Sequence, residues 1–160
     1  MQVQSWLVLA LTGALVTGGV AGADAVDHRA STVEVTAKRT LMSAPAAPAV
    51  GAGFVSGGQL FDAQGAVQVG EGYSHCGVLA VSVTVPPEVT THCTSTFRLK
   101  DGELHLSGIR VYKTIALGFG DTTVAVVGGT GAYTNARGEG KVTRANTQDV
   151  AYRFIFTLPD

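Results

Sequence analysis

The stretch VVGGTGAYTNARGEGKV, from Val126 to Val142, decides the fold of this chain. An apolar run leads into a glycine-rich turn, and a second run leads back out to valine. Gly128, Gly129 and Gly131 are expected to supply positive φ angles for a sharp turn at the rim of a β-structure. No helix is expected after these glycines, and the lysine and Ser/Thr of a phosphate-binding loop are missing. We therefore interpret the segment as structural and not as a site of chemistry.

On both sides of this stretch, short runs of β-branched and aromatic residues alternate with turn residues. The Asp-Gly pair of Lys100-Asp101-Gly102 is typical of a tight hairpin. This pattern predicts an all-β domain, built as a sandwich or a closed barrel. The expected strands cover residues 32–38, 54–61, 67–85, 90–99, 103–112, 122–127, 138–145 and 150–158.

The composition excludes several other classes of protein. Charged residues make up 14% of the 160 residues and glycine contributes 21, whereas about 25% charge and about 7% glycine are usual. The chain is too apolar to be intrinsically disordered. Its net charge of −1 provides no basic field, so we expect no nucleic-acid partner.

The N-terminal segment has the composition of an export signal. Residues 6–23, WLVLALTGALVTGGVAGA, carry no charge and end in small residues. We expect residues 1–25 to be a signal peptide that is cleaved near Ala25, and residues 26–160 to be a single domain of a secreted protein. Two alternatives stay open, because no Lys or Arg precedes the run and it is about the minimum length for spanning a bilayer. They are an uncleaved membrane anchor and a misassigned start codon.

The Val126–Val142 stretch resembles the hallmark segment of the allene oxide cyclase and dirigent superfamily. In that group an apolar strand runs into a GGTG turn, an aromatic residue and Ala-Arg-Gly. LFDAQGAVQVG (Leu60 to Gly70) and CTSTFRLKDGELHLSG (Cys93 to Gly108) are similar to further hairpins of the family, in the same order. The resemblance implies an eight-stranded antiparallel closed β-barrel with an apolar lumen, which is just wide enough to be filled by side chains or to hold one small ligand.

The resemblance also implies chemistry that needs no cofactor. Members of the superfamily cyclise a fatty-acid epoxide, steer the coupling of phenoxy radicals made by a separate oxidase, or fold a polyene for an intramolecular [4+2] cycloaddition. All three hold an apolar substrate in a reactive shape, which is catalysis by proximity and orientation. We expect a cofactor-free cyclase of a polyketide-type polyene. The alternatives are a secreted dirigent-like barrel that binds or steers a hydrophobic small molecule without catalysis, and a structural role.

Aromatic side chains at alternate strand positions are the candidate lining of the lumen. Tyr152, Phe154 and Phe156 share one face of the last expected strand. His75 is included as a proton donor beside Tyr73, and its alternative is a surface histidine. The whole set can also be explained as core filling, and no residue is assigned a catalytic role. The candidate substrate-binding residues are Phe54, Tyr73, His75, Phe97, Tyr112, Tyr152, Phe154 and Phe156.

Cys76 and Cys93 are the only cysteines, and an even pair in an exported protein indicates a disulfide. A catalytic thiol and two buried free thiols are the alternatives. The four histidines lack the spacing of a metal site, so we expect no metal. Several expected strands are apolar on both faces, which indicates that another subunit covers the outer wall. We therefore expect a homodimer or homotrimer.

Overall fold

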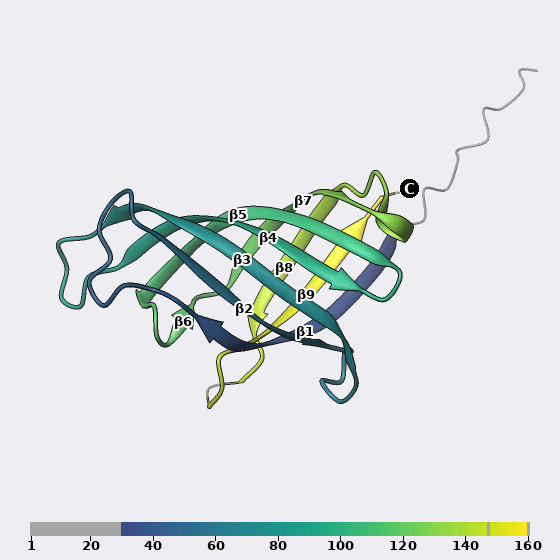
Figure 1. Ribbon diagram of the computed structural model, residues 1–160, viewed down its shortest axis with the longest axis horizontal. Helices are drawn as coiled ribbons and strands as arrows, with labels where there is room; N and C mark the ends of the chain where they lie inside the picture. The colour runs from purple at the N-terminus through teal and green to yellow at the C-terminus, as the bar shows by residue number, and fades with distance from the viewer. Residues whose placement is uncertain (1–29, 147, 160) are drawn as a thin grey trace, which may run out of the picture.

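The computed structural model describes residues 30–146 and 148–159, and these form a closed antiparallel β-barrel (Figure 1). Eight strands pair in the order β1-β2-β3-β4-β5-β7-β8-β9, and β9 pairs back with β1. A ninth, two-residue strand, β6 (Gly118–Phe119), pairs with the end of β5 at Tyr112 and Thr114, beyond the part of β5 that pairs with β7. The predicted all-β barrel is therefore confirmed. The barrel strands are β1 Ser31–Met42, β2 Gly53–Phe61, β3 Gln68–Val81, β4 Val89–Leu99, β5 Gly102–Thr114, β7 Thr122–Gly129, β8 Gly138–Arg144 and β9 Ala151–Leu158.

Within the described residues there is no α-helix, and thus no helix long and apolar enough to span a membrane. The predicted signal peptide, residues 1–25, lies outside the described residues. Two expected strand limits differ from the structure by four residues. β1 continues past Lys38 to Met42, because Met42 still pairs with Ser56 on β2. β3 ends at Val81, because residues 82–88 form a loop in which the Ser82 hydroxyl accepts a hydrogen bond from the Glu88 N–H at 2.7 Å.

Period-two alternation places one face of each strand inside the barrel. On β9, Tyr152, Phe154 and Phe156 are buried while Arg153 points outward. The inward side chains of all eight long strands meet in one hydrophobic core. A closed barrel of this kind leaves no unpaired strand edge along its wall.

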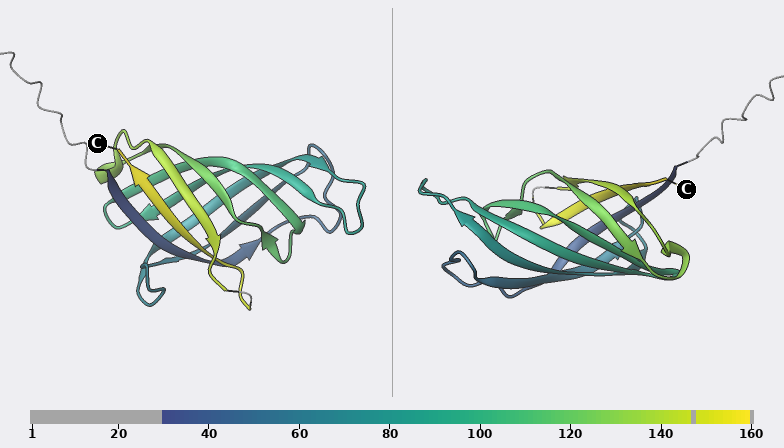
Figure 2. Two further views of the ribbon diagram at one scale, coloured as in Figure 1. Left: turned by 180° about the vertical axis from the view of Figure 1, so that it is seen from behind. Right: turned by 90° about the horizontal axis from the view of Figure 1, so that it is seen from above.

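The connections gather at the two ends of the barrel (Figure 2). Residues 43–52, 82–88, 115–121, 145–146 and 148–150 lie at one end, which we call the loop end. Residues 62–67, 100–101 and 130–137 lie at the other, which we call the turn end. The segment that identified the fold thus belongs to the turn end.

At the turn end, the glycine-rich segment is bound to the β4–β5 hairpin. The N–H groups of Thr130 and Ala132 donate to the carbonyl oxygens of Glu103 and Asp101 at 2.9 and 2.8 Å. Of the three glycines expected to have positive φ, only Gly131 does, at +60°. Gly128 and Gly129 continue β7 instead. Gly129 is required for a different reason, which is the lack of room for a side chain. A Cβ atom there would lie 2.4 Å from the carbonyl oxygen of Tyr133.

We predict that Gly102→Ala lowers the free energy of unfolding by about 3 kcal/mol or more, from backbone strain and a backbone clash together. Gly102 has φ +149°, and a Cβ atom there would lie 2.1 Å from the carbonyl oxygen of Thr130. Urea denaturation followed by circular dichroism measures the loss. Gly77→Ala is the matched control, since no atom lies within 4 Å of a Cβ built at Gly77. Equal stability of the two variants would contradict this account of the hairpin contact.

Candidate functional site

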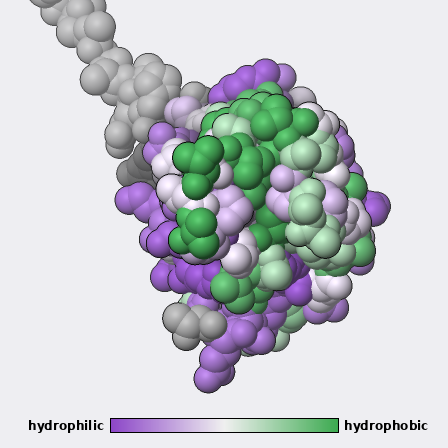
Figure 3. Space-filling model, turned by 90° about the vertical axis from the view of Figure 1, so that its left-hand side faces the viewer, coloured by the Kyte–Doolittle hydropathy of each residue, from purple (hydrophilic) through white to green (hydrophobic). Residues whose placement is uncertain are grey.

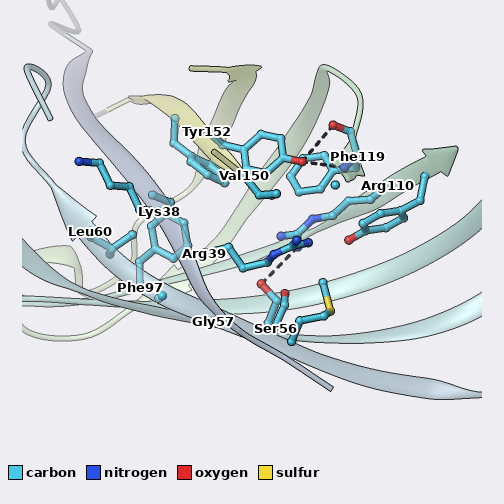
Figure 4. A pocket seen from close by; sticks show the side chains of 18 residues that line it. Lys38, Arg39, Ser56, Gly57, Leu60, Phe97, Arg110, Phe119, Val150 and Tyr152 are labelled. Carbon is cyan, nitrogen blue, oxygen red and sulfur yellow. Dashed lines mark hydrogen bonds between the residues drawn. The ribbon is translucent and has the colours of Figure 1, made fainter. Parts of the chain in front are cut away.

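A cavity of about 60 Å³ lies inside the barrel (Figure 4). Its wall includes Met42, Gly118 and Val150, which lie at the end of β1, in β6 and just before β9. The cavity therefore reaches the loop end. The side chains that carry the argument below are Phe97, Arg110, Tyr112, Phe119, Tyr152 and Phe154.

Aromatic rings from four strands pack against one another around this cavity. Phe97 on β4 meets Phe154 on β9 edge to face, with centroids 4.9 Å apart. Phe119 on β6 stacks on Tyr152 of β9 at 3.9 Å with an interplanar angle of 5°. Tyr112 on β5 meets Phe119 edge to face at 5.6 Å. Such pairs contribute about 0.5–1.5 kcal/mol each beyond the area they bury, so the rings stabilise one another in the cavity wall.

Six of the eight candidate substrate-binding residues point into the barrel. Phe97, Tyr112, Tyr152 and Phe154 line the cavity. Phe54 and Phe156 are 2% and 0% exposed and belong to the hydrophobic core, outside the cavity wall.

The expectation that Tyr73 and His75 face the lumen was wrong. On β3 the inward positions are Gly72, Ser74 and Cys76, so the two residues between them point outward. Tyr73 is 42% exposed, and its hydroxyl donates to Glu71 Oε2 at 2.9 Å. A proton donor for the lumen therefore does not come from His75.

The predicted disulfide is confirmed. Cys76 and Cys93 are directly paired residues of β3 and β4 and are bonded to each other, which excludes both thiol alternatives. Both are buried on the inner face of the wall. Among the residues that the structure describes, no three His, Cys, Asp or Glu side chains are grouped to hold a metal ion.

Arg110 is the site residue that the sequence analysis missed. It lies on β5 between Leu106 and Tyr112 at an inward position and is 4% exposed. Its Nη1 and Nη2 donate to the hydroxyls of Ser74 and Ser95 at 3.3 and 2.8 Å. The sequence does contain a sign of this residue, because Arg110 is a basic residue on the strand face that otherwise carries Leu104, Leu106 and Tyr112.

Residues 115–119, which we call the strap, complete the cavity wall with Gly118 and Phe119. Side chains from three barrel strands hold its backbone. Arg39 donates to the carbonyl oxygens of Ile115 and Ala116, and Arg144 donates to that of Leu117.

The Tyr152 hydroxyl completes the attachment of the strap. It accepts the Phe119 N–H at 2.6 Å and donates to the Phe119 carbonyl at 3.0 Å. Burial raises the pKa of Tyr152, and the hydrogen bond to the Phe119 backbone offsets part of that rise. Burial likewise raises the pKa of Tyr112, and the neighbouring Arg110 partly opposes it. Both phenols are therefore neutral at pH 7, where a hydroxyl can donate a hydrogen bond as well as accept one.

The fold and this cavity can be compared with known proteins. A family model described as "Allene oxide cyclase barrel like domain" matches residues 31–156. A search of the curated proteins finds no match.

Among solved structures, the barrel is similar to a pyocyanin demethylase, with a TM-score of 0.63 and 24% identity over 80% of this chain and 99% of that one. It is similar to the Diels–Alderase AbmU from Streptomyces koyangensis, with a TM-score of 0.55 and 14% identity over 85% of this chain and 70% of that one. It is also similar to the pterocarpan synthase dirigent protein PsPTS1, with a TM-score of 0.57 and 15% identity over 82% and 95%. At these identities the similarity is one of fold.

Proposed function

Because this chain belongs to the allene oxide cyclase barrel-like family, we propose that it is a cofactor-independent cyclase. Its substrate is an apolar polyene of polyketide type, held in the barrel lumen for an intramolecular [4+2] ring closure. The observation that carries the proposal is the cavity walled by Phe97, Tyr112, Phe119 and Tyr152, whose rings are fixed by one another and by the strands.

A [4+2] ring closure requires the protein to hold the substrate in a reactive conformation and requires no group transfer. In a [4+2] closure a diene and an alkene form two new σ bonds and one new π bond from three π bonds, and no atom, proton or electron leaves the molecule. Holding the two reacting ends in contact can contribute up to about 7–11 kcal/mol in favourable cases. The aromatic side chains of the barrel strands, Phe97, Tyr112, Tyr152 and Phe154, are suited to this task because they line the cavity from several sides.

The loop end suits the entry of an apolar molecule. Apolar side chains gather on this end of the barrel (Figure 3), and Val50, Val83, Val85 and Leu117 are all more than half exposed there. Exposed apolar patches of this kind are often binding surfaces. We infer that the substrate enters between these loops.

Entry also requires the strap to move. The cavity of about 60 Å³ is smaller than the roughly 300–1,000 Å³ of pockets that hold drug-sized ligands. Phe119 is the lining aromatic residue that lies on a two-residue strand and not on a barrel strand, so it is the ring whose movement would leave the barrel wall intact. The polyene therefore displaces Phe119 from its stack on Tyr152 as it binds.

Purified protein incubated with linear 1,7,9-trienes of ten to sixteen carbons tests the proposal. We expect ring closure faster than in buffer, with an excess of one stereoisomer by chiral gas chromatography. Tyr73→Ala, on the outer wall, is the matched control and is expected to match the unsubstituted protein. Racemic product at the buffer rate would overturn the cyclase proposal. If the trienes bind without acceleration, the dirigent-like alternative is the correct one.

A further inference from the structure

Arg110 is a buried cation without an anionic partner among the described residues. It is 4% exposed, and none of the ion pairs of residues 30–146 and 148–159 includes it. Two neutral hydroxyls, from Ser74 and Ser95, accept its Nη groups, and these hydroxyls lie 2.7 Å from each other. The positive charge of the guanidinium is thus buried without a compensating negative charge.

One nitrogen of the guanidinium also has no hydrogen-bond partner in the part of the chain that the structure describes. Its Nε is buried and has no hydrogen-bond partner within the described residues. Its central carbon lies 4.7 Å from the centroid of the Phe119 ring, and Arg110 forms part of the cavity wall. Figure 4 shows Arg110 beside Phe119, reaching in among the other lining side chains.

An unpaired buried charge and an unpaired buried donor both destabilise a fold. Arginine cannot avoid this cost by losing its proton, because the guanidinium stays protonated in proteins. The ring of Phe119 compensates part of the charge as a cation–π partner, but it cannot accept the Nε–H in the plane of the guanidinium. The arrangement becomes favourable once a planar anion with oxygen atoms occupies the cavity, since Arg is suited to bind such groups through two parallel hydrogen bonds.

We propose that Arg110 binds a planar anionic oxygen group of the substrate, of the carboxylate type, through Nε. The substrate is then an amphiphile with one acidic end near Arg110 and an apolar chain that extends along the cavity to Phe97 and Phe154. Ser74 and Ser95 are positioning residues that fix the plane of the guanidinium. This inference rests on the proposed function in taking the lumen as the ligand site and in the displacement of Phe119 that opens it.

The test compares two probes that share one carbon chain, 2,4-decadienoic acid and 2,4-decadien-1-ol, by isothermal titration calorimetry at pH 7. The acid is ionised at this pH, whereas the alcohol is neutral. We expect the unsubstituted protein to bind the acid at least about tenfold more tightly, as a hydrogen bond to a charged group implies. Arg110→Met should remove this preference while changing the affinity for the alcohol by less than about threefold.

Three further variants distinguish the possible causes of the preference for the acid over the alcohol. Arg98→Met removes an equally basic side chain from the outer wall, where 64% of it is exposed, and should keep the preference. Ser95→Ala should reduce the preference by freeing one Nη group. Arg110→Lys keeps the charge without the fork of donors and should fall between the unsubstituted protein and Arg110→Met. It also serves as the test if Arg110→Met does not fold.

The outcomes distinguish this inference from the proposed function. Equal affinity of the unsubstituted protein for acid and alcohol overturns the anion site and leaves the lumen as an apolar site. A preference that survives in Arg110→Met also overturns it, because the anion is then held elsewhere. If neither probe binds, the lumen is not a ligand site, and the proposed function fails together with the inference.

Discussion

Phe97→Ala is expected to lower the free energy of unfolding by about 3–5 kcal/mol, the usual cost of removing a fully buried phenylalanine. Phe97 is 3% exposed and is in edge-to-face contact with both Phe154 and Phe156, at 4.9 and 5.9 Å. Those two rings come from β9, on the other side of the lumen from β4, which carries Phe97. The neighbouring strands cannot collapse into the gap, because the closed ladder fixes the diameter of the barrel.

Equilibrium urea denaturation measures this loss, with Tyr73→Ala as the aromatic control on the outer wall. The control should lose about 1 kcal/mol or less, as is usual for exposed positions. Phe97→Ala should also enlarge the cavity and shift the best substrate among the linear trienes toward longer chains. A loss below 1 kcal/mol, equal to that of the control, would mean that the ring does not pack as described.

Replacing both cysteines, as Cys76→Ala with Cys93→Ala, is expected to destabilise the barrel by about 3 kcal/mol. The two residues are separated by 17 positions, so the bond closes a loop of moderate length and restricts the unfolded chain. Burial of both sulfur atoms in the inner wall should also protect the bond from reductant while the barrel is folded.

Thermal and urea unfolding with and without dithiothreitol measure this effect. Under reducing conditions the unsubstituted protein should approach the stability of the double variant, and the double variant should not respond to reductant. Unreduced protein denatured in guanidinium should give no reaction with a thiol reagent. Two reactive thiols per chain in that experiment would contradict the disulfide.

Strand alternation predicted most of the wall of the barrel, because burial inside a closed sheet enforces a period of two. Tyr152, Phe154 and Phe156 were placed on one face for this reason, and that face is the inner one. The error at His75 could have been avoided from the sequence. Phe97 and Cys93 share a face of β4, so an inward Phe97 requires an inward disulfide, which turns His75 outward.

Two features of the site could not be predicted from the sequence pattern. β6 has only two residues, Gly118 and Phe119, and forms because Arg39, Arg144 and Tyr152 bind the strap from distant strands. No local propensity encodes such contacts. The surroundings of Arg110 depend on side chains from three other strands, Ser74 on β3, Ser95 on β4 and Phe119 on β6. The pairing of β3 with β4, of β4 with β5 and of β5 with β6 brings these side chains together.

The family's glycine-rich segment and the cavity lie at opposite ends of the barrel, and this separation has an evolutionary consequence. The glycine-rich segment by which the family is recognised is bonded to the β4–β5 hairpin at the turn end, whereas the cavity reaches the loop end. Loops such as 43–52 and 82–88 can therefore accumulate changes, or be exchanged between relatives, without disturbing the closure of the sheet. Descendants of one ancestral barrel could thus keep the same signature while diverging in the molecules they accept. The glycine-rich segment at the turn end thus indicates family membership, whereas the loop end determines ligand specificity.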